Sequence, residues 1–129
     1  MDMRRNTRMF RPWFVAAIVV ACGIALSAPR VAFAHAKLVS SQPEVNGKVS
    51  GPEVAVLLKF NSRVDMKHST LTLLTPDGRV QKVVIESEPE PGVLSAKLTG
   101  LVKGAYVLRW QVLATDGHIT RDKVPFRVE

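Results

Sequence analysis

Apolar residues alternate with polar ones along most of the second half of the chain. Between residues 53 and 60, the side chains of Val54, Val56, Leu58 and Phe60 fall on every second position. A period of two is typical of a β-strand that buries one face. The same period recurs in four later stretches, at 71–73, 80–84, 94–98 and 106–112. No window has the spacing of an amphipathic helix, so we expect an all-β chain.

Turn-forming residues separate these stretches. Glycine and proline occur in the breaks at 43–47, 51–52, 75–78, 89–92 and 103–104. Asp77-Gly78, between two strand-like runs, indicates a β-hairpin. With a first strand at 36–40 and a last one at 124–128, the pattern predicts about seven short strands. This spacing favours one domain, an immunoglobulin-like Greek-key β-sandwich of the cupredoxin-like type.

Two segments carry further structural expectations. Pro125 interrupts the last strand pattern and has no N–H to donate, so that strand should lie at a sheet edge or contain a bulge. Residues 86–92, with three glutamates and two prolines, are expected to form the most mobile loop. Four aromatic residues occupy inward positions of the alternation and are expected in the core: Phe60, Tyr106, Trp110 and Phe126.

The first 34 residues differ in character from the rest. Four arginines between residues 4 and 11 precede an uncharged apolar run from Trp13 to Leu26. That run, about fourteen residues, is shorter than the ~20 that span a bilayer as a helix. It is typical of a cleavable secretory signal peptide. The small–large–small triplet Ala32-Phe33-Ala34 predicts a signal peptide over 1–34 and a periplasmic mature protein, residues 35–129, that begins at His35.

Two other interpretations of this segment stay open. Arg4-Arg5 could direct twin-arginine export, although the residues after the pair fit that motif poorly. Val19-Val20-Ala21-Cys22 resembles a lipobox, which would leave the protein lipid-anchored at Cys22. Against that anchor, the apolar run continues to Leu26 and a second cleavage site follows. Because Cys22 is the only cysteine, residues 35–129 contain neither a disulfide nor a thiolate ligand.

Charge and catalytic motifs exclude several functions. Five of the eighteen basic residues but only one of the eleven acids precede residue 35, so the remainder is only slightly basic, without a basic run. Binding to nucleic acid is therefore not expected. The chain also has no nucleophile elbow and no glycine-rich phosphate loop, which argues against hydrolases and nucleotide-binding proteins. We expect a monomer.

The histidines point to a metal. His35 would be the first mature residue, and a free N-terminal histidine can chelate a metal through its α-amino and ring nitrogens once both are deprotonated. Asp116 and His118 follow the 106–112 strand two residues apart, where they can project to one side. Gly117 between them leaves room for backbone adjustment. Cu(II) prefers a tetragonal plane of nitrogen and oxygen donors, which this set supplies. On spacing alone, however, an Asp-x-His pair is more often a loop-end hydrogen bond.

Together these features resemble the periplasmic copper-resistance proteins of the CopC type. The resemblance spans essentially all of 35–129, through HAKLVSSQP at 35–43, VLLKFN at 56–61, the 104–112 strand with TDGH at 115–118, and the closing strand at 120–128. It implies that His35, Asp116 and His118 bind one Cu(II) per chain. It also implies a carrier or buffer in copper resistance or homeostasis, not an enzyme, that exchanges copper with a membrane or outer-membrane copper-handling protein. Arg121-Asp122-Lys123 stands where the family usually has a small residue, a departure that concerns loop shape more than the ligands.

Some proteins of this type also hold Cu(I) in a methionine-rich loop with a histidine. Here Met66 is the only methionine after residue 34, and it lies near His68. One thioether and one imidazole make a poor site for Cu(I). We therefore expect residues 64–68 to form a surface turn, with Asp65 as an ordinary turn acid.

Three other functions are alternatives to the copper carrier. A metal-free interaction domain would need only the sandwich. Copper monooxygenases that attack polysaccharides also use an N-terminal histidine on such a sandwich, but Asp116 would fill a position that they keep open for oxygen. A blue-copper electron carrier requires a cysteine thiolate, which residues 35–129 do not contain.

Overall fold

Residues 35–129 are described by a computed structural model. The predicted signal peptide at 1–34 and the alternative anchor at Cys22 lie outside these residues. Nine β-strands follow one another along the described chain: β1 Leu38–Gln42, β2 Gly47–Val49, β3 Val54–Phe60, β4 Val64–Leu74, β5 Val80–Val83, β6 Ile85–Glu90, β7 Val93–Leu98, β8 Gly104–Ala114 and β9 Ile119–Val128. No helix suited to crossing a bilayer is found in this part of the chain.

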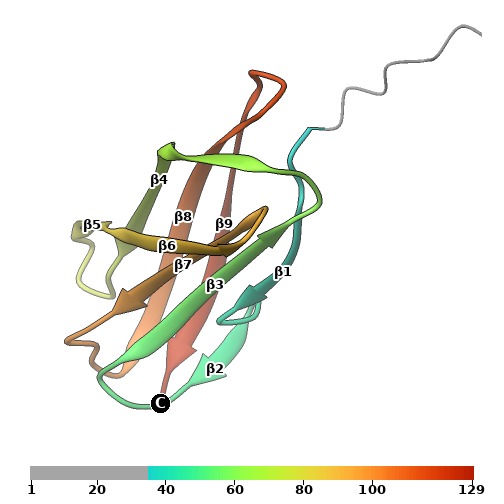
Figure 1. The fold of residues 1–129 in the computed structure, drawn as a ribbon. Helices are drawn as coiled ribbons and strands as arrows, with labels where there is room; N and C mark the ends of the chain where they lie inside the picture. The colour runs from blue at the N-terminus through green and yellow to red at the C-terminus, as the bar shows by residue number, and fades with distance from the viewer. Residues whose placement is uncertain (1–34) are drawn as a thin grey trace, which may run out of the picture. The chain divides into compact units, whose positions relative to one another are not determined.

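The strands form two sheets packed as layers (Figure 1). One has four strands in the order β1-β3-β7-β6, and the other has five in the order β2-β9-β8-β4-β5. All neighbouring strands are antiparallel except β2 and β9. The predicted all-β, immunoglobulin-like sandwich is confirmed. The described residues contain nine strands instead of about seven, because β2 lies beside a predicted turn and β6 in a predicted loop.

Apolar side chains of the two sheets meet in a core between the layers. β3 alternates strictly between buried and exposed residues, as its sequence pattern predicts. The four aromatic residues expected inside are at most 4% exposed. Phe60 meets Trp110 edge to face at 5.0 Å between ring centroids, and Tyr106 stacks on Phe126 at 5.5 Å. Because this core lies within residues 36–128, the part after the predicted cleavage site has a hydrophobic core of its own.

Pro125 does not lie in an edge strand, and its strand has no bulge there. β9 lies between β8 and β2, and its register with β8 runs without a shift. The Pro125 carbonyl accepts a hydrogen bond from the Asn46 N–H at 2.6 Å, on the side away from β8. The proline nitrogen faces that same side, where β2 begins only at Gly47. The ladder with β8 therefore does not need the N–H that proline lacks.

Two other local expectations were wrong. Residues 85–90, which overlap the expected mobile loop at 86–92, form the edge strand β6, which pairs with β7 through two register shifts. Glutamates and proline suit an edge strand because one side of its ladder has no partner. Residues 64–68 are not a turn but the start of β4, where the register with β8 shifts between Asp65 and Thr70. Met66 packs against the core from this irregular stretch.

Candidate metal centre

The loop between β8 and β9 carries two of the three expected donors. It closes as a short hairpin in which the Gly117 N–H donates to the Ala114 carbonyl and the Ala114 N–H donates to the His118 carbonyl, both at 2.9 Å. Gly117 has a φ of +87°, a left-handed conformation that L residues rarely adopt. A tight hairpin loop commonly needs such a residue before the next strand begins. The glycine between Asp116 and His118 is therefore a requirement of the turn.

Asp116 and His118 hold each other within this loop. One carboxylate oxygen of Asp116 accepts the His118 backbone N–H at 3.0 Å, and the other lies 3.1 Å from His118 Nδ1. The backbone N–H of His118, followed by its imidazole, lowers the pKa of the Asp116 carboxyl. Desolvation opposes this shift, and the charge of His35 adds to it. The sequence predicts that strand alternation places the two side chains on one side. A turn in which the aspartate caps the backbone brings them together instead.

His35 comes from the other end of the described chain, on the short arm before β1. The arm is fixed at two points. Ala36 is fully buried in the core. The Lys37 N–H donates to Asn61 Oδ1 at 2.8 Å, and the Asn61 N–H donates back to the Lys37 carbonyl at 3.0 Å. These contacts place the exposed ring of His35 beside the β8–β9 loop.

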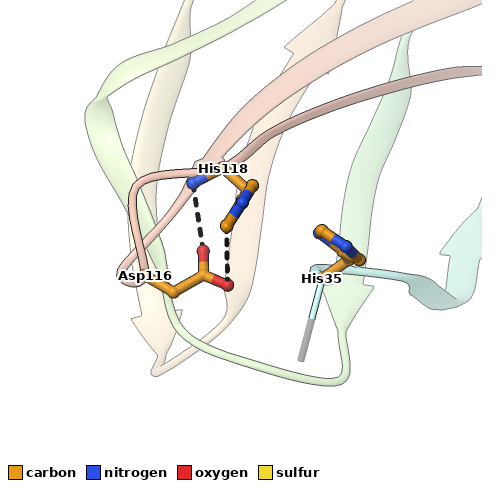
Figure 2. A group of neighbouring side chains, drawn as sticks. All are labelled: His35, Asp116 and His118. Carbon is orange, nitrogen blue, oxygen red and sulfur yellow. Dashed lines mark hydrogen bonds and ion pairs between the residues drawn. The ribbon is translucent and has the colours of Figure 1, made fainter. Parts of the chain in front are cut away.

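The three expected donors converge. One ligand atom from each of His35, Asp116 and His118 lies within 4.8 Å of the others. The rings of His35 and His118 are 4.8 Å apart between centroids and nearly perpendicular, at 87°. Figure 2 shows Asp116 and His118 joined on one loop and the ring of His35 beside them on the arm. Among residues 35–129 no other group of three or more histidine, cysteine or acidic residues is arranged in this way.

The geometry and chemistry of the group fit a small, divalent transition metal. Donors that share one ion lie about 2 Å from it, and so up to about 4 Å from each other. The ligand atoms of His35, Asp116 and His118 lie within 4.8 Å of one another, slightly farther apart than this. Because the side chains are exposed, rotation about their χ angles can bring these atoms closer. Two imidazoles and a carboxylate suit Cu(II) among the common metals, although Zn²⁺ accepts the same donors. In the 129-residue chain the His35 nitrogen is a peptide amide, so cleavage before His35 would add a fourth donor.

A second aspartate–histidine pair lies at the start of β4. Asp65 accepts the N–H groups of Lys67 and His68 at 2.9 and 3.2 Å, and its second oxygen is 2.9 Å from His68 Nδ1. The His68 imidazole is the main cause of a lowered pKa at Asp65. This pair reproduces the local contacts of Asp116 and His118 without a third donor. It therefore organises the irregular start of β4 and is a natural control for the candidate site.

Sequence reasoning named the three converging donors but did not identify what positions His35. In the sequence, Asn61 stands out only as part of the motif at 56–61, and Ala36 only as the start of the first predicted strand. Neither residue type signals such a role, because each acts through a contact with a segment more than twenty residues away or with the core.

Comparison with known proteins gives the family. The model of the CopC domain matches residues 38–129. The chain belongs to the CopC family. Copper resistance protein C of Xanthomonas campestris pv. juglandis is 30% identical to this CopC chain over 128 residues, which cover 93% of this chain and 98% of that protein. The match to the family model begins just after the arm that carries His35, and it includes Asp116 and His118.

Two further CopC relatives place the match in context. The crystal structure of CopC from Methylosinus trichosporium OB3b superposes with a TM-score of 0.68 at 28% identity, covering 74% of this chain and 94% of that one. Copper transport protein CutJ of Bacillus subtilis is 27% identical over 103 residues, 78% of this chain. That match covers only 19% of CutJ, so this chain spans about a fifth of the length of that relative.

Proposed function

We propose that this CopC protein binds one Cu(II) ion in the periplasm through His35, Asp116 and His118 and acts as a carrier or buffer in copper resistance or homeostasis. The observation that carries the proposal is the convergence of these three donors within 4.8 Å from segments at opposite ends of the domain. The names of relatives, a copper resistance protein and a copper transport protein, support copper as the ion.

The proposed mechanism is coordination, without turnover of a substrate. After cleavage before His35, the α-amine and the ring of that residue chelate the ion, and Asp116 and His118 complete a plane of four donors. Because the α-amine and imidazoles must lose protons to bind, the affinity rises with pH between about 6 and 8. A carboxylate in the plane favours the oxidised ion, so reduction to Cu(I) weakens binding and permits release to a membrane or outer-membrane copper-handling protein.

Electron paramagnetic resonance tests this ligand set. One equivalent of Cu(II) is added to protein that begins at His35 and to protein with one extra residue before it. We expect a single nitrogen-rich tetragonal signal from the first protein and an altered, weaker site in the second, because the extension converts the amine to an amide. Weak, mixed signals from both proteins would contradict the chelate.

The second aspartate–histidine pair provides the control. His118→Ala should weaken binding and give a different signal with fewer nitrogen donors, whereas His68→Ala should leave the signal unchanged, since His68 has the same kind of aspartate contact but no third donor. An equal loss in both variants would mean that copper binds exposed histidines without a specific site. Retention of the signal in His118→Ala would remove that residue from the ligand set.

Processing is tested separately by the intact mass of the exported protein. Cleavage before His35 gives an unanchored chain whose mass is that of residues 35–129. A mass that retains Cys22 with attached lipid would establish the anchored alternative, and the N-terminal chelate would then be absent.

A further inference from the structure

The outward face of the five-stranded sheet gathers cations that are scattered along the sequence. Across the sheet, Lys123 of β9 pairs with Arg109 of β8, Arg109 with Thr72 of β4, and Thr72 with Lys82 of β5. In the adjacent row Arg121 pairs with Gln111. Directly paired residues project to the same face with their Cβ atoms about 5 Å apart. Four cations therefore occupy two adjoining rows, which we call the basic rows.

The basic rows have little compensation from acids. Among residues 35–129, none of the ion pairs found includes Lys82, Arg109, Arg121 or Lys123. Arg121 Nε donates instead to the Gln111 side-chain oxygen at 2.7 Å. Like charges directly opposite each other, such as Arg109 and Lys123, destabilise a sheet. Folding alone therefore gives no reason for this arrangement.

An open hollow of about 420 Å³ lies over the basic rows. Three cations line it, together with Thr70 and Thr72. Asp122 is the single acid in the lining, and its carboxylate accepts the backbone N–H of Lys123 at 2.8 Å. The hollow thus offers several hydrogen-bond donors and a positive field to a ligand that carries more than one negative charge.

The basic rows adjoin the candidate metal centre. Three of their four cations, Arg109, Arg121 and Lys123, lie on β8 and β9, the strands that the Asp116–His118 loop connects, and Arg121 follows His118 by only three residues. A partner seated on this face would hold its own surface next to the loop. Cations at the edge of a transfer site are a common means of steering and orienting a partner of opposite charge.

We propose that the basic rows are the docking surface for an acidic segment of the protein with which this chain exchanges copper. This inference rests on the proposed copper function for the identity of the exchange, but the charge arrangement stands independently of it. A protein segment fits better than an anionic membrane, because three of the cations line a hollow that a chain segment can enter and a bilayer surface cannot. Two exposed apolar side chains, Val80 and Ile119, lie on the same face in the rows that flank the basic rows on either side, where they can contact apolar residues of the same segment.

The test uses a fluorescein-labelled peptide of ten glutamates and protein that begins at His35. Peptide binding is followed by fluorescence anisotropy at low and physiological ionic strength. The variant Lys82→Glu/Lys123→Glu places acids on both sides of Arg109, and the control Lys59→Glu/Lys103→Glu makes the same change of net charge away from the basic rows. We expect affinity to fall about tenfold or more in the first variant and less than about twofold in the control.

Several outcomes would overturn the proposal. Equal losses in the two variants would mean that only net charge matters, and non-saturable binding by the wild type would mean that there is no site. Tight binding to vesicles containing phosphatidylglycerol, sensitive to the same variant, together with no peptide binding would assign the face to a membrane. The melting temperature should not fall in Lys82→Glu/Lys123→Glu, because Arg109 gains opposite charges, so lost binding cannot be ascribed to unfolding.

The same assay separates this proposal from the copper function. His118→Ala should bind the peptide as the wild type does, while Lys82→Glu/Lys123→Glu should bind Cu(II) as the wild type does. If Cu(II) fails to bind the wild type but the peptide still binds at the basic rows, the docking surface stands and the copper assignment falls. If copper binds and the peptide does not, the docking surface falls alone.

Discussion

Replacement of Asn61 by alanine should weaken Cu(II) binding although Asn61 is not expected to touch the ion. The change removes the side-chain oxygen that accepts the Lys37 N–H at 2.8 Å. The return bond, from the Asn61 N–H to the Lys37 carbonyl, is a backbone interaction and survives the substitution. The arm that carries His35 would then be held at Lys37 by one hydrogen bond instead of two.

The size of the effect follows from the strength of the lost bond. A typical intramolecular hydrogen bond contributes about 0.5–1.5 kcal/mol. Since about 1.4 kcal/mol is a factor of ten in an equilibrium constant, the population of the anchored arm should decrease by about two- to tenfold relative to the detached arm. To the extent that the arm detaches in the metal-free protein, the apparent affinity falls with that population. Ala36, which is buried and unchanged, limits the loss.

Competition for Cu(II) with a chromophoric chelator measures this change at pH 7. Asn61→Asp keeps an oxygen acceptor at the same position and should recover affinity to within about twofold of the wild type. The electron paramagnetic resonance spectrum should be the same in all three proteins, since the ligands are unchanged. If Asn61→Ala melts at a lower temperature but binds Cu(II) with unaltered affinity, the arm is not coupled to the metal centre and the reasoning is refuted.

Three further substitutions test the local architecture. Ser69→Ala should lower the free energy of unfolding, measured by chemical denaturation, by about 1–3 kcal/mol. The reason is that the buried Ser69 hydroxyl accepts the Leu113 N–H where the register of β4 shifts. An unchanged midpoint would mean that water replaces the hydroxyl as the acceptor. Gly117→Ala should destabilise by about 1–2 kcal/mol through backbone strain alone, since nothing lies within 4 Å of the added Cβ, and Gly117→Asn should be milder. The Thr75 hydroxyl, followed by Arg79, lowers the pKa of the Asp77 carboxyl in the folded protein. The ionised Asp77 carboxylate therefore contributes its full stabilisation above the unfolded-state pKa, and this stabilisation is lost as pH falls through the lower folded-state pKa. The difference in melting temperature between wild type and Asp77→Asn should accordingly shrink between about pH 5 and pH 2.

Sequence alone predicted the regular strands well and the irregular ones poorly. β3 and β8 could be read from their alternation because each buries one face over its whole length. The alternation of Val80 and Val84 suggested one continuous strand, yet Val83 is the buried residue and Val84 is 74% exposed. The chain passes from one sheet to the other at Val84, and the inward side is reset there. An apolar period of two does not indicate where the chain crosses from one sheet to the other.

In the candidate site, too, the contact between residues close in sequence could be predicted and the contact between distant segments could not. Asp116 and His118 could be paired from sequence because a short turn brings them together, although strand alternation was the wrong reason for it. Placing His35 beside them required the predicted cleavage site and the family resemblance. Its anchors could not be predicted, because burial of Ala36 and the bond between Asn61 and Lys37 depend on how β1 meets β3.

The division of the site between a rigid loop and an anchored arm bears on how an ion would be released. Asp116 and His118 are fixed to each other by two contacts within one hairpin, and that hairpin continues into the most extensively paired strands of the larger sheet. His35, in contrast, is exposed, and beyond the buried Ala36 it is held by the edge-to-face contact of its ring with His118. In a site of this form the arm is the element that can open at the smallest free-energy cost, since its movement breaks few contacts. Release by a partner on the adjoining basic rows would therefore begin with His35, while Asp116 and His118 stay in place to pass on the ion.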